Sequence, residues 1–326
     1  MSAISQTGPG TFAIRSGSGF FARHLREISV ASAYLMLLAA LAVFRPTFFR
    51  DQFRDTWVSA APVLMAAAGM TLVILTRQID ISIGSQFSVC GVVAGLLAAW
   101  PLPMPLVVIG TVASGAVLGA VNGVLVAWMG LPSIVVTLAT MVILRGGLMW
   151  ATQGAAVRLP PHFQWLGASQ QVGQWTILVV ALGVFIMLAW GLRWLAAGRT
   201  VYAVGSDQEA ARLAGIRPRR VVCAVFILMG GLAGLAALLN AARFTIVYPN
   251  YGEGLELKVI AAVVVGGTAI SGGRGTLAGT LIGVALLATI APALVFLGGQ
   301  PQWEKAIQGA IILAAVATDG LRRRAS

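Results

Sequence analysis

The residues that could do chemistry in this 326-residue chain are few and widely spaced. Gly267–Arg274 resembles a phosphate-binding loop, but it ends in Gly-Arg where Lys-Ser/Thr is needed to hold phosphates and Mg²⁺. Gly273-x-Gly275-x-x-Ala278 is a lone dinucleotide fingerprint without an acidic residue about twenty positions later. The two cysteines and two histidines lack the spacing of metal ligands. We therefore expect no catalytic site, no nucleotide site and no metal site in this chain.

Ionisable residues beside or inside apolar stretches form a second group of candidates. Asp80 is expected to cap a helix that starts at Ile81, while nearby serines satisfy freed backbone donors. A plain interhelical turn is the alternative for this segment. Arg145 lies deep inside an apolar run, where snorkelling is awkward, so we expect it to face inward. The residues assigned to a pathway or gate are Arg77, Asp80, Ser82, Ser85, Arg145, Gly266, Gly267, Thr268 and Ser271.

The longest charged interruption of the apolar sequence spans residues 193–220. Within it, Gly205–Ile216 is predicted to form one short helix, with Asp207 as the N-cap and Gly215 as the C-terminal stop. Its alanines form a small-residue face that another surface could approach closely. We expect this helix to contact a cytoplasmic partner. The residues expected to make that contact are Asp207, Glu209, Ala210, Ala211, Arg212 and Gly215.

Composition places the elements that carry these residues in a membrane. The chain is 58% hydrophobic and 10% charged, whereas a soluble domain carries about 25% charged residues. The formal net charge of +12 could indicate nucleic-acid binding, but the arginines flank apolar runs, as the positive-inside rule predicts. The chain is therefore expected to be an all-α polytopic protein that contacts a lipid bilayer and no nucleic acid.

About 20 apolar residues are needed to cross a bilayer as a helix, and ten segments are candidates. The eighth is too short for a straight span, so we expect a half-helix or a re-entrant element there. Together they predict one transmembrane domain at 28–320, between a disordered tail at 1–27 and a basic tail at 321–326. The ten segments are Ile28–Phe44, Trp57–Thr76, Ile81–Trp100, Pro105–Met129, Pro132–Ala151, Trp175–Leu192, Val221–Ala242, Val259–Ile270, Leu277–Leu297 and Trp303–Thr318.

The distribution of basic residues predicts orientation. An even number of spans with the N-terminus inside places both termini, Arg77, the 193–220 loop and Arg274 on the cytoplasmic side. The bias is imperfect, because Arg158 and Arg243 fall on the other face.

Small residues recur within the spans at helical spacing. Glycines lie four or five residues apart from Gly110 to Gly123, and Gly230, Gly231 and Gly234 form a second group, which predicts close helix packing. A weak similarity also links residues 74–85 with 264–275, since both are apolar runs that end in a polar residue followed by Ser and Gly. Two broken elements at corresponding places are typical of transporters built from repeats.

Four stretches, taken together, resemble one family. They are GMTLVILTRQIDISIGS at 69–85, NGVLVAWMGLPSIVVTLATMVILRGG at 122–147, GRTVYAVGSDQEAARLAGI at 198–216 and ELKVIAAVVVGGTAISGGRGTLAGTLIG at 256–283. From about residue 57 onward the chain is similar to the permease subunit of ribose-type bacterial ATP-binding-cassette (ABC) importers, in the superfamily shared with branched-chain amino-acid permeases. Many sugar permeases have Gly-Gly before the Ile-Asp, whereas this chain has Arg77-Gln78. That form resembles the rhamnose and autoinducer-2 branches.

The resemblance implies an ABC importer permease fold of about ten helices with broken elements, in the bacterial inner membrane. It implies a homodimer or a heterodimer with a sister permease, a periplasmic sugar-binding protein outside and ATPase subunits inside. The ATPase would bind ATP and Mg²⁺, so this chain would be no enzyme and would hold no cofactor. Glu209-Ala210-Ala211-x-x-x-Gly215 falls where the family has its coupling helix. The solute is expected to be a sugar that is rhamnose, ribose-like or autoinducer-2-like.

An ion-coupled secondary transporter and a structural membrane subunit are the alternatives. A secondary transporter would need several carboxylates within its spans, whereas Asp80, Glu304 and Asp319 all lie near predicted span ends. The displayed helix at 205–216 argues against a purely structural subunit. Copurification with an ATPase would separate the importer from both alternatives.

Overall fold

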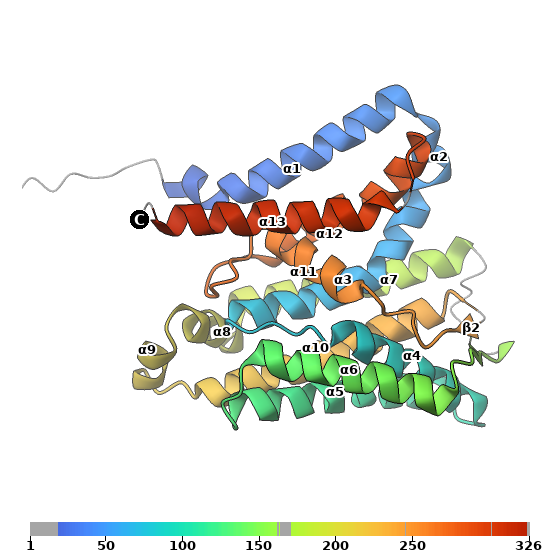
Figure 1. Cartoon of the computed structure of the whole chain (residues 1–326), viewed down its shortest axis with the longest axis horizontal. Coiled ribbons are helices and arrows are strands. Elements are labelled where there is room, and N and C mark those ends of the chain that lie inside the picture. The colour runs from blue at the N-terminus through green and yellow to red at the C-terminus, as the bar shows by residue number, and fades with distance from the viewer. Residues whose placement is uncertain (1–18, 162, 164–170, 245, 301, 325–326) are drawn as a thin grey trace, which may run out of the picture.

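The computed structural model describes residues 19–161, 163, 171–244, 246–300 and 302–324, which contain thirteen helices and two short strands. The longer helices run side by side (Figure 1). The elements are α1 Gly19–Phe44, α2 Thr47–Asp51, α3 Phe53–Leu75, α4 Ile83–Ala99, α5 Met104–Ala127, α6 Ser133–Thr152, β1 Val157–Arg158, α7 Gln171–Trp194, α8 Ala196–Ser206, α9 Gln208–Leu213, α10 Pro218–Ala241, β2 Ile246–Val247, α11 Leu255–Val265, α12 Leu277–Phe296 and α13 Trp303–Arg324.

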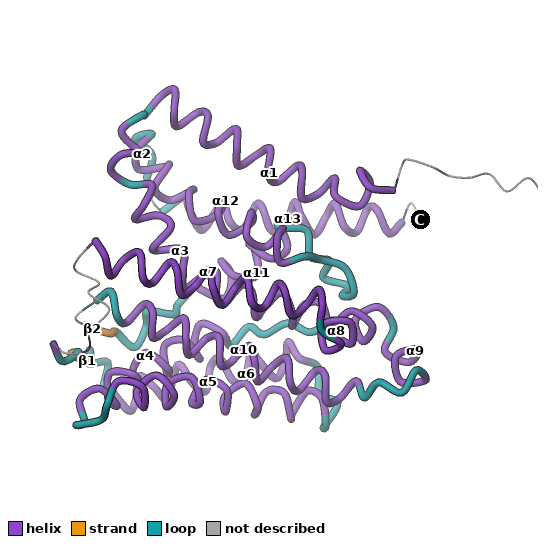
Figure 2. The backbone as a smooth tube through the Cα atoms, turned by 180° about the vertical axis from the view of Figure 1, so that it is seen from behind, coloured by secondary structure: helices purple, strands orange, loops and turns teal. Residues whose placement is uncertain are grey.

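The two ends of the helical layer differ. Helices α8 and α9 lie together at one end, and the antiparallel pair of β1 and β2 lies at the other, where Val157 is opposite Val247. Figure 2 shows the same separation from behind. We call these the α9 end and the strand end.

Each of the ten predicted segments contains one helix, which confirms the all-α polytopic fold. Seven helices of the described chain are long and apolar enough to cross a membrane: α1, α3, α5, α6, α7, α10 and α12. Helix α4 is apolar but has only 17 residues. Helix α11 has 11 residues, about 16 Å at 1.5 Å per residue, so it is the short element predicted for the eighth segment.

The predicted N-terminal boundary of the transmembrane domain is wrong, and the structure adds detail at two other places. Residues 19–27 belong to α1 instead of a disordered tail, and residues 1–18 lie outside the described part. At the other terminus α13 continues to Arg324, so the predicted basic tail at 321–326 is helical up to that residue. The helix predicted within 205–216 is α9, which begins after Asp207, and the preceding helix α8, which ends at Ser206, was not predicted.

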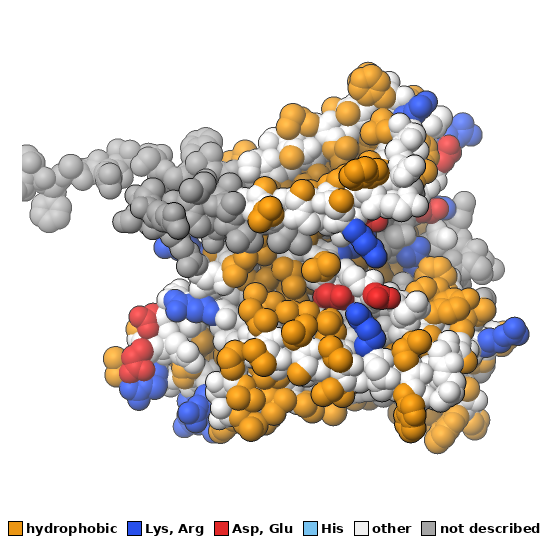
Figure 3. Space-filling view, viewed as in Figure 1, with side chains coloured by type: hydrophobic (Ala, Val, Ile, Leu, Met, Phe, Trp, Pro, Cys, Tyr) orange, Lys and Arg blue, Asp and Glu red, His pale blue; other side chains and the backbone are white. Residues whose placement is uncertain are grey.

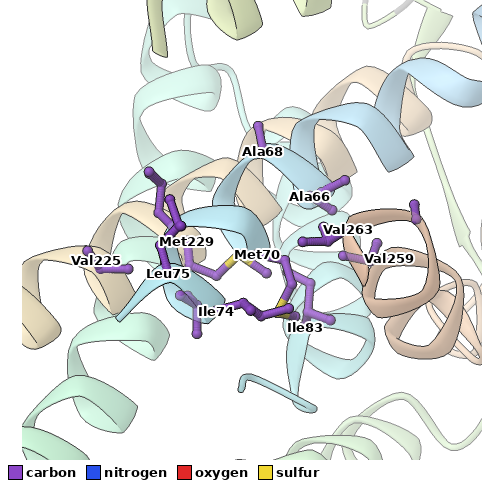
Figure 4. Packing of buried hydrophobic residues seen from close by; sticks show 14 of the residues in the cluster. Ala66, Ala68, Met70, Ile74, Leu75, Ile83, Val225, Met229, Val259 and Val263 are labelled. Atoms are coloured by element: carbon purple, nitrogen blue, oxygen red, sulfur yellow. The ribbon is translucent and has the colours of Figure 1, made fainter. Parts of the chain in front are cut away.

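Helix α3 is the centre of the core. All of its residues from Ala60 to Leu75 are buried, which is possible because the helix is apolar on every side. Figure 4 shows Met70 and Ile74 among apolar side chains of three other helices. Those side chains are Ile83 of α4, Val225 and Met229 of α10, and Val259 and Val263 of α11.

Helices α5 and α10 pack backbone to backbone through the predicted glycines. A Cβ atom at Gly115 would overlap the carbonyl oxygen of Gly230, and one at Gly119 would overlap that of Phe226. No residue but glycine fits at such distances without moving a helix. The close packing predicted from the glycine spacing is confirmed.

Candidate functional site

Two broken elements meet inside the molecule. Residues 76–82 connect α3 to α4, and residues 266–276 connect α11 to α12, both without helical structure. The backbone N–H of Gly273, in the second connection, donates a hydrogen bond of 2.9 Å to the carbonyl of Leu75, which ends α3. The broken elements predicted from the similarity of 74–85 and 264–275 are therefore present and in contact.

The end of α8 joins this contact. A Cβ atom at Gly205 would overlap the carbonyl oxygen of Leu75 and would lie 2.7 Å from the Gly273 nitrogen. Arg77 donates from Nε to the Gly205 carbonyl at 2.5 Å and from Nη2 to the Ser206 carbonyl. A cation there favours the C-terminal end of a helix. We call Leu75, Arg77, Gly205, Ser206 and Gly273 the three-segment junction.

A buried polar network occupies the first broken element. Asp80 is fully buried, and its Oδ1 accepts hydrogen bonds from the Ser82 N–H at 2.9 Å and the Ser82 hydroxyl at 2.6 Å. Gln86 Nε2 donates to Asp80 Oδ2 at 3.0 Å. Asn122 of α5 donates to Ser82 Oγ at 2.9 Å and accepts from Thr140 of α6 at 2.7 Å. The network thus joins α4, α5 and α6.

The prediction that Asp80 caps a helix beginning at Ile81 is wrong. Helix α4 begins at Ile83, and its N-cap residue is Ser82. Ile81 stays in the connection because its N–H donates to Thr137 Oγ1 of α6 at 3.1 Å. This tertiary hydrogen bond takes the place of a helix cap at Ile81. Asp80 Oδ1 instead accepts hydrogen bonds from Ser82.

Helix α6 satisfies the open backbone of this connection along one face. Ser133 Oγ accepts a hydrogen bond from the Ile79 N–H at 3.2 Å, and Thr137 Oγ1 donates one to the Ile79 carbonyl at 3.3 Å. Non-helical backbone at membrane depth requires such partners. This role of α6 was not predicted, although the spacing of Ser133, Thr137 and Thr140 in an apolar run was a usable signal.

Most of the predicted pathway residues lie inside the subunit. The side chains of Asp80, Ser82, Ser85 and Thr268 are at most 3% exposed, and Gly266 is buried. Gly267 and Ser271 are half-buried. These residues therefore support the broken elements in this conformation and do not line an open surface.

Arg145 of α6 is more exposed than the buried pathway residues, with 36% of its side chain accessible. Its Nη2 is 3.5 Å from Glu256 Oε1, and its Nη1 is 4.0 Å from Glu253 Oε1. These acidic partners were not predicted, since they lie far away in the chain, before and at the start of α11. Acidic and basic side chains gather in the middle of this face, between wide apolar areas (Figure 3).

Helix α9 is capped at both ends, as predicted. Asp207 Oδ1 accepts hydrogen bonds from the N–H groups of Glu209 and Ala210, both at 2.9 Å. Gly215 has a φ of 83°, the left-handed conformation that glycine favours. The backbone hydrogen bonds from Ala210 and Glu209 lower the pKa of Asp207. The hydrogen bond from Arg212 lowers the pKa of Glu209, the two side chains being 2.5 Å apart.

The predicted orientation of Ala211 is wrong. Its side chain is 4% exposed and packs in the main core, so it cannot belong to an outward-facing surface. Leu213 is 77% exposed, and Ala210 and Ala214 are exposed as well. A hollow of about 530 Å³ lies beside α9. It is lined by Trp128, Gln208, Glu209, Arg212, Ile216, Arg217, Pro218, Arg219 and Arg220.

Known proteins match nearly the whole chain. Residues 53–316 match the family described as "Branched-chain amino acid transport system / permease component". The autoinducer 2 import system permease protein of Salmonella typhi is 35% identical over 309 residues, which cover 93% of this chain and 88% of that protein. The ribose import permease protein of Escherichia coli (strain K12) is 35% identical over 317 residues, which cover 94% and 98%. No solved structure matches the chain.

Proposed function

Because this chain belongs to the family of permease components of branched-chain amino acid transport systems, we propose that it passes a sugar through the bacterial inner membrane. It is a multi-pass permease subunit of the ABC importer type, without an ATPase domain of its own. ATP and Mg²⁺ are handled by the partner ATPase, and a binding protein delivers the solute. The similarity to two import permeases over more than nine-tenths of the chain carries this proposal.

The solute is ribose-like or autoinducer-2-like in this proposal. The two relatives named above are permeases for ribose and for autoinducer 2, at the same 35% identity. Arg77-Gln78 also indicates rhamnose. The transport assay described below distinguishes rhamnose from the other two solutes.

Helix α9 is the proposed docking element for the ATPase. It is capped at both ends, it presents Leu213 outward, and the neighbouring hollow is rich in arginine. Because α8 ends at Ser206, directly before α9, a shift of α9 moves the three-segment junction and with it both broken elements. Asp207, Glu209, Ala210, Arg212 and Gly215 shape and present the helix. Ala211 anchors it to the core.

The gate of the proposed transport cycle is the pair of broken elements. The Asp80 network and the Gly266–Ser271 connection would change shape when the junction moves, because Asp80 follows Arg77 by three residues and Ser271 precedes Gly273 by two. The proposed orientation puts the α9 end in the cytoplasm and the strand end in the periplasm. A second permease copy, identical or homologous, completes the assembly.

Transport in reconstituted vesicles tests the proposed function. The permease, its ATPase and its binding protein are placed in proteoliposomes, and uptake of labelled ribose, rhamnose and autoinducer 2 is measured with and without internal ATP. Uptake that needs ATP and the binding protein is expected. Uptake driven by a proton or sodium gradient without ATP would favour the secondary-transporter alternative, and failure of the ATPase to copurify would contradict the docking role of α9.

A further inference from the structure

Five charged side chains lie together on one face of the molecule, between the α9 end and the strand end. They come from three segments: α6, the residues around the start of α11, and the start of α13. Arg145 lies near Glu253 and Glu256, and Lys258 Nζ lies 2.9 Å from Glu304 Oε1. Figure 3 shows charges of both signs in the middle of this face. We call these five residues the charged cluster.

The charged cluster lies deep within the membrane-spanning layer. A Cβ atom at Gly84 would overlap Glu256 Oε2, so this carboxylate packs directly on the start of α4. Helix α4 continues from there to Ala99 near the strand end, about 22 Å at 1.5 Å per residue. Arg145 is about 10 Å from the end of α6 at Thr152. Both depths fall inside a hydrocarbon core about 30 Å thick.

The cluster has hydrogen-bonding capacity that the described residues leave unused. The Glu256 side chain is only 10% exposed, yet its Oε2 has no hydrogen-bond partner among them. Arg145 Nη2 also makes no hydrogen bond within that set, because 3.5 Å to Glu256 is beyond the usual length. Buried polar atoms are normally paired. Both atoms are closed off from solvent, so the groups of the cluster that a solute can reach are the Glu253 carboxylate and the exposed part of the Arg145 guanidinium.

Lipid cannot cover this face. Glu253 is 59% exposed and Arg145 is 36% exposed, and charged side chains at this depth face a bundle interior or a water-filled cavity. The exposed part of the cluster therefore needs water or polar groups against it. The Asp80 network, in contrast, is closed within the subunit and offers a passing solute nothing.

We propose that the charged cluster lines the transport route and binds a neutral, polyhydroxylated solute in passing. This inference rests on the proposed function and assigns its route to the face carrying Arg145, Glu253 and Glu256. A hydroxyl group both donates and accepts hydrogen bonds, so it can pair with the carboxylate and with the guanidinium at once. Because the cluster holds two basic and three acidic groups, it attracts neither anions nor cations strongly.

The segment before α11 adds an apolar contact suited to the same solute. Tyr248 and Tyr251 are both exposed, and their ring centroids are 5.5 Å apart. Tyr251 precedes Glu253 by two residues, so the rings belong to the same turn as the acidic group. A tyrosine offers an apolar ring face and a polar hydroxyl, which match the C–H face and the hydroxyls of a sugar.

Thiol accessibility tests whether the cluster contacts water. Glu253→Cys is made in a chain with Cys90→Ala and Cys223→Ser, assembled with its partners in proteoliposomes, and treated with a membrane-impermeant methanethiosulfonate. The matched control is Ile186→Cys, an exposed residue of α7 at comparable depth. We expect Glu253→Cys to react at least about tenfold faster, because the reactive thiolate forms in water and not in hydrocarbon. Equal, slow reaction of both, at rest and during ATP hydrolysis, would overturn the proposal.

Solute selectivity tests the contact itself. Glu253→Gln keeps the size of the side chain and removes its charge. With one binding protein throughout, the ratio of ribose uptake to 2-deoxyribose uptake is expected to fall about fivefold relative to the unaltered chain, since a charged acceptor discriminates a missing hydroxyl better than a neutral one. A lower overall rate with an unchanged ratio would mean a merely structural role and would overturn the proposal. Absence of uptake by the unaltered chain would instead contradict the proposed function.

Discussion

Leu75 and Gly273 are joined by a hydrogen bond of 2.9 Å between the carbonyl that ends α3 and an N–H in the connection before α12. Gly205 of α8 lies against the same carbonyl. Both broken elements therefore share one contact with the segment that leads to α9.

Gly205→Ala is expected to separate α8 from the broken elements. The added methyl would overlap the Leu75 carbonyl oxygen, and overpacking of this kind costs about 1–3 kcal/mol. ATP hydrolysis by the assembled complex should continue while uptake falls. Gly183→Ala in α7 is the control, because nothing lies within 4 Å of a Cβ atom there. Normal uptake by a well-assembled Gly205→Ala variant would show that the close contact is dispensable.

Two substitutions of Arg77 should separate its backbone from its side chain. The residue has a φ of 63°, which glycine adopts more easily than other residues by roughly 1 kcal/mol. Arg77→Gly should therefore melt at a higher temperature than Arg77→Ala, while both lose the hydrogen bonds to Gly205 and Ser206 and transport less solute per ATP. Equal melting temperatures would refute the backbone argument. Full transport efficiency in both variants would refute the role of the guanidinium.

The N-terminal turn of α9, which Asp207 caps, should become less stable at acidic pH. Its pKa is lowered by backbone hydrogen bonds from Ala210 and Glu209, so its stabilising effect is complete above the ordinary aspartate pKa of about 4. The effect is lost as the pH falls through the lower value of the folded chain. Hydrogen exchange at Glu209 and Ala210, corrected for intrinsic rates, should rise in that acidic range.

Two variants control the Asp207 experiment. Asp207→Asn retains a capping oxygen and should remove the pH dependence with little loss of protection at neutral pH, whereas Asp207→Ala should lower protection about fivefold. The cap would have no role if the alanine variant exchanged as slowly as the unaltered chain at pH 7.

Substitutions of Leu213 and Ala211 should affect two different properties, ATPase affinity and permease stability. Leu213→Ser removes an exposed apolar side chain, and its loss from an interface should weaken ATPase affinity about tenfold without changing the melting temperature of the permease. Ala211→Trp should lower the melting temperature, because Ala211 packs in the core. Titration of ATPase onto the purified permease measures the first effect. Unchanged affinity of Leu213→Ser would remove this residue from the docking surface.

Features that depend on nearby residues could be predicted from the sequence. The cap at Asp207 and the stop at Gly215 follow from residues within one short helix, and both are confirmed. The spans could be predicted from hydropathy, because a helix that crosses the hydrocarbon core needs apolar residues along its whole length. The close approach of Gly115 and Gly230 follows from glycines at helical spacing.

Features that depend on distant partners could not be predicted. Asp80 was expected to cap a helix by a local rule, but the Thr137 hydroxyl competes for the Ile81 N–H. Arg145 was expected to face inward, yet nothing near it in the chain indicated Glu256 as its partner. Helix α8 was missed because only Gly198, Val201, Val204 and Gly205 form its buried side, a pattern weak in apolar residues.

The central position of α3 has a consequence for how the chain is made. Helix α3 is among the first to leave the ribosome, but the helices packed around it include α10, α11 and α12, which are synthesised much later. Until they arrive, α3 must sit in lipid or at the translocon. Its apolar residues from Ala60 to Leu75 are compatible with both surroundings, so α3 can stay in the membrane as a single spanning helix before its partners are made. Helix α11 is too short to span the bilayer alone, and it is synthesised only after most of the other helices.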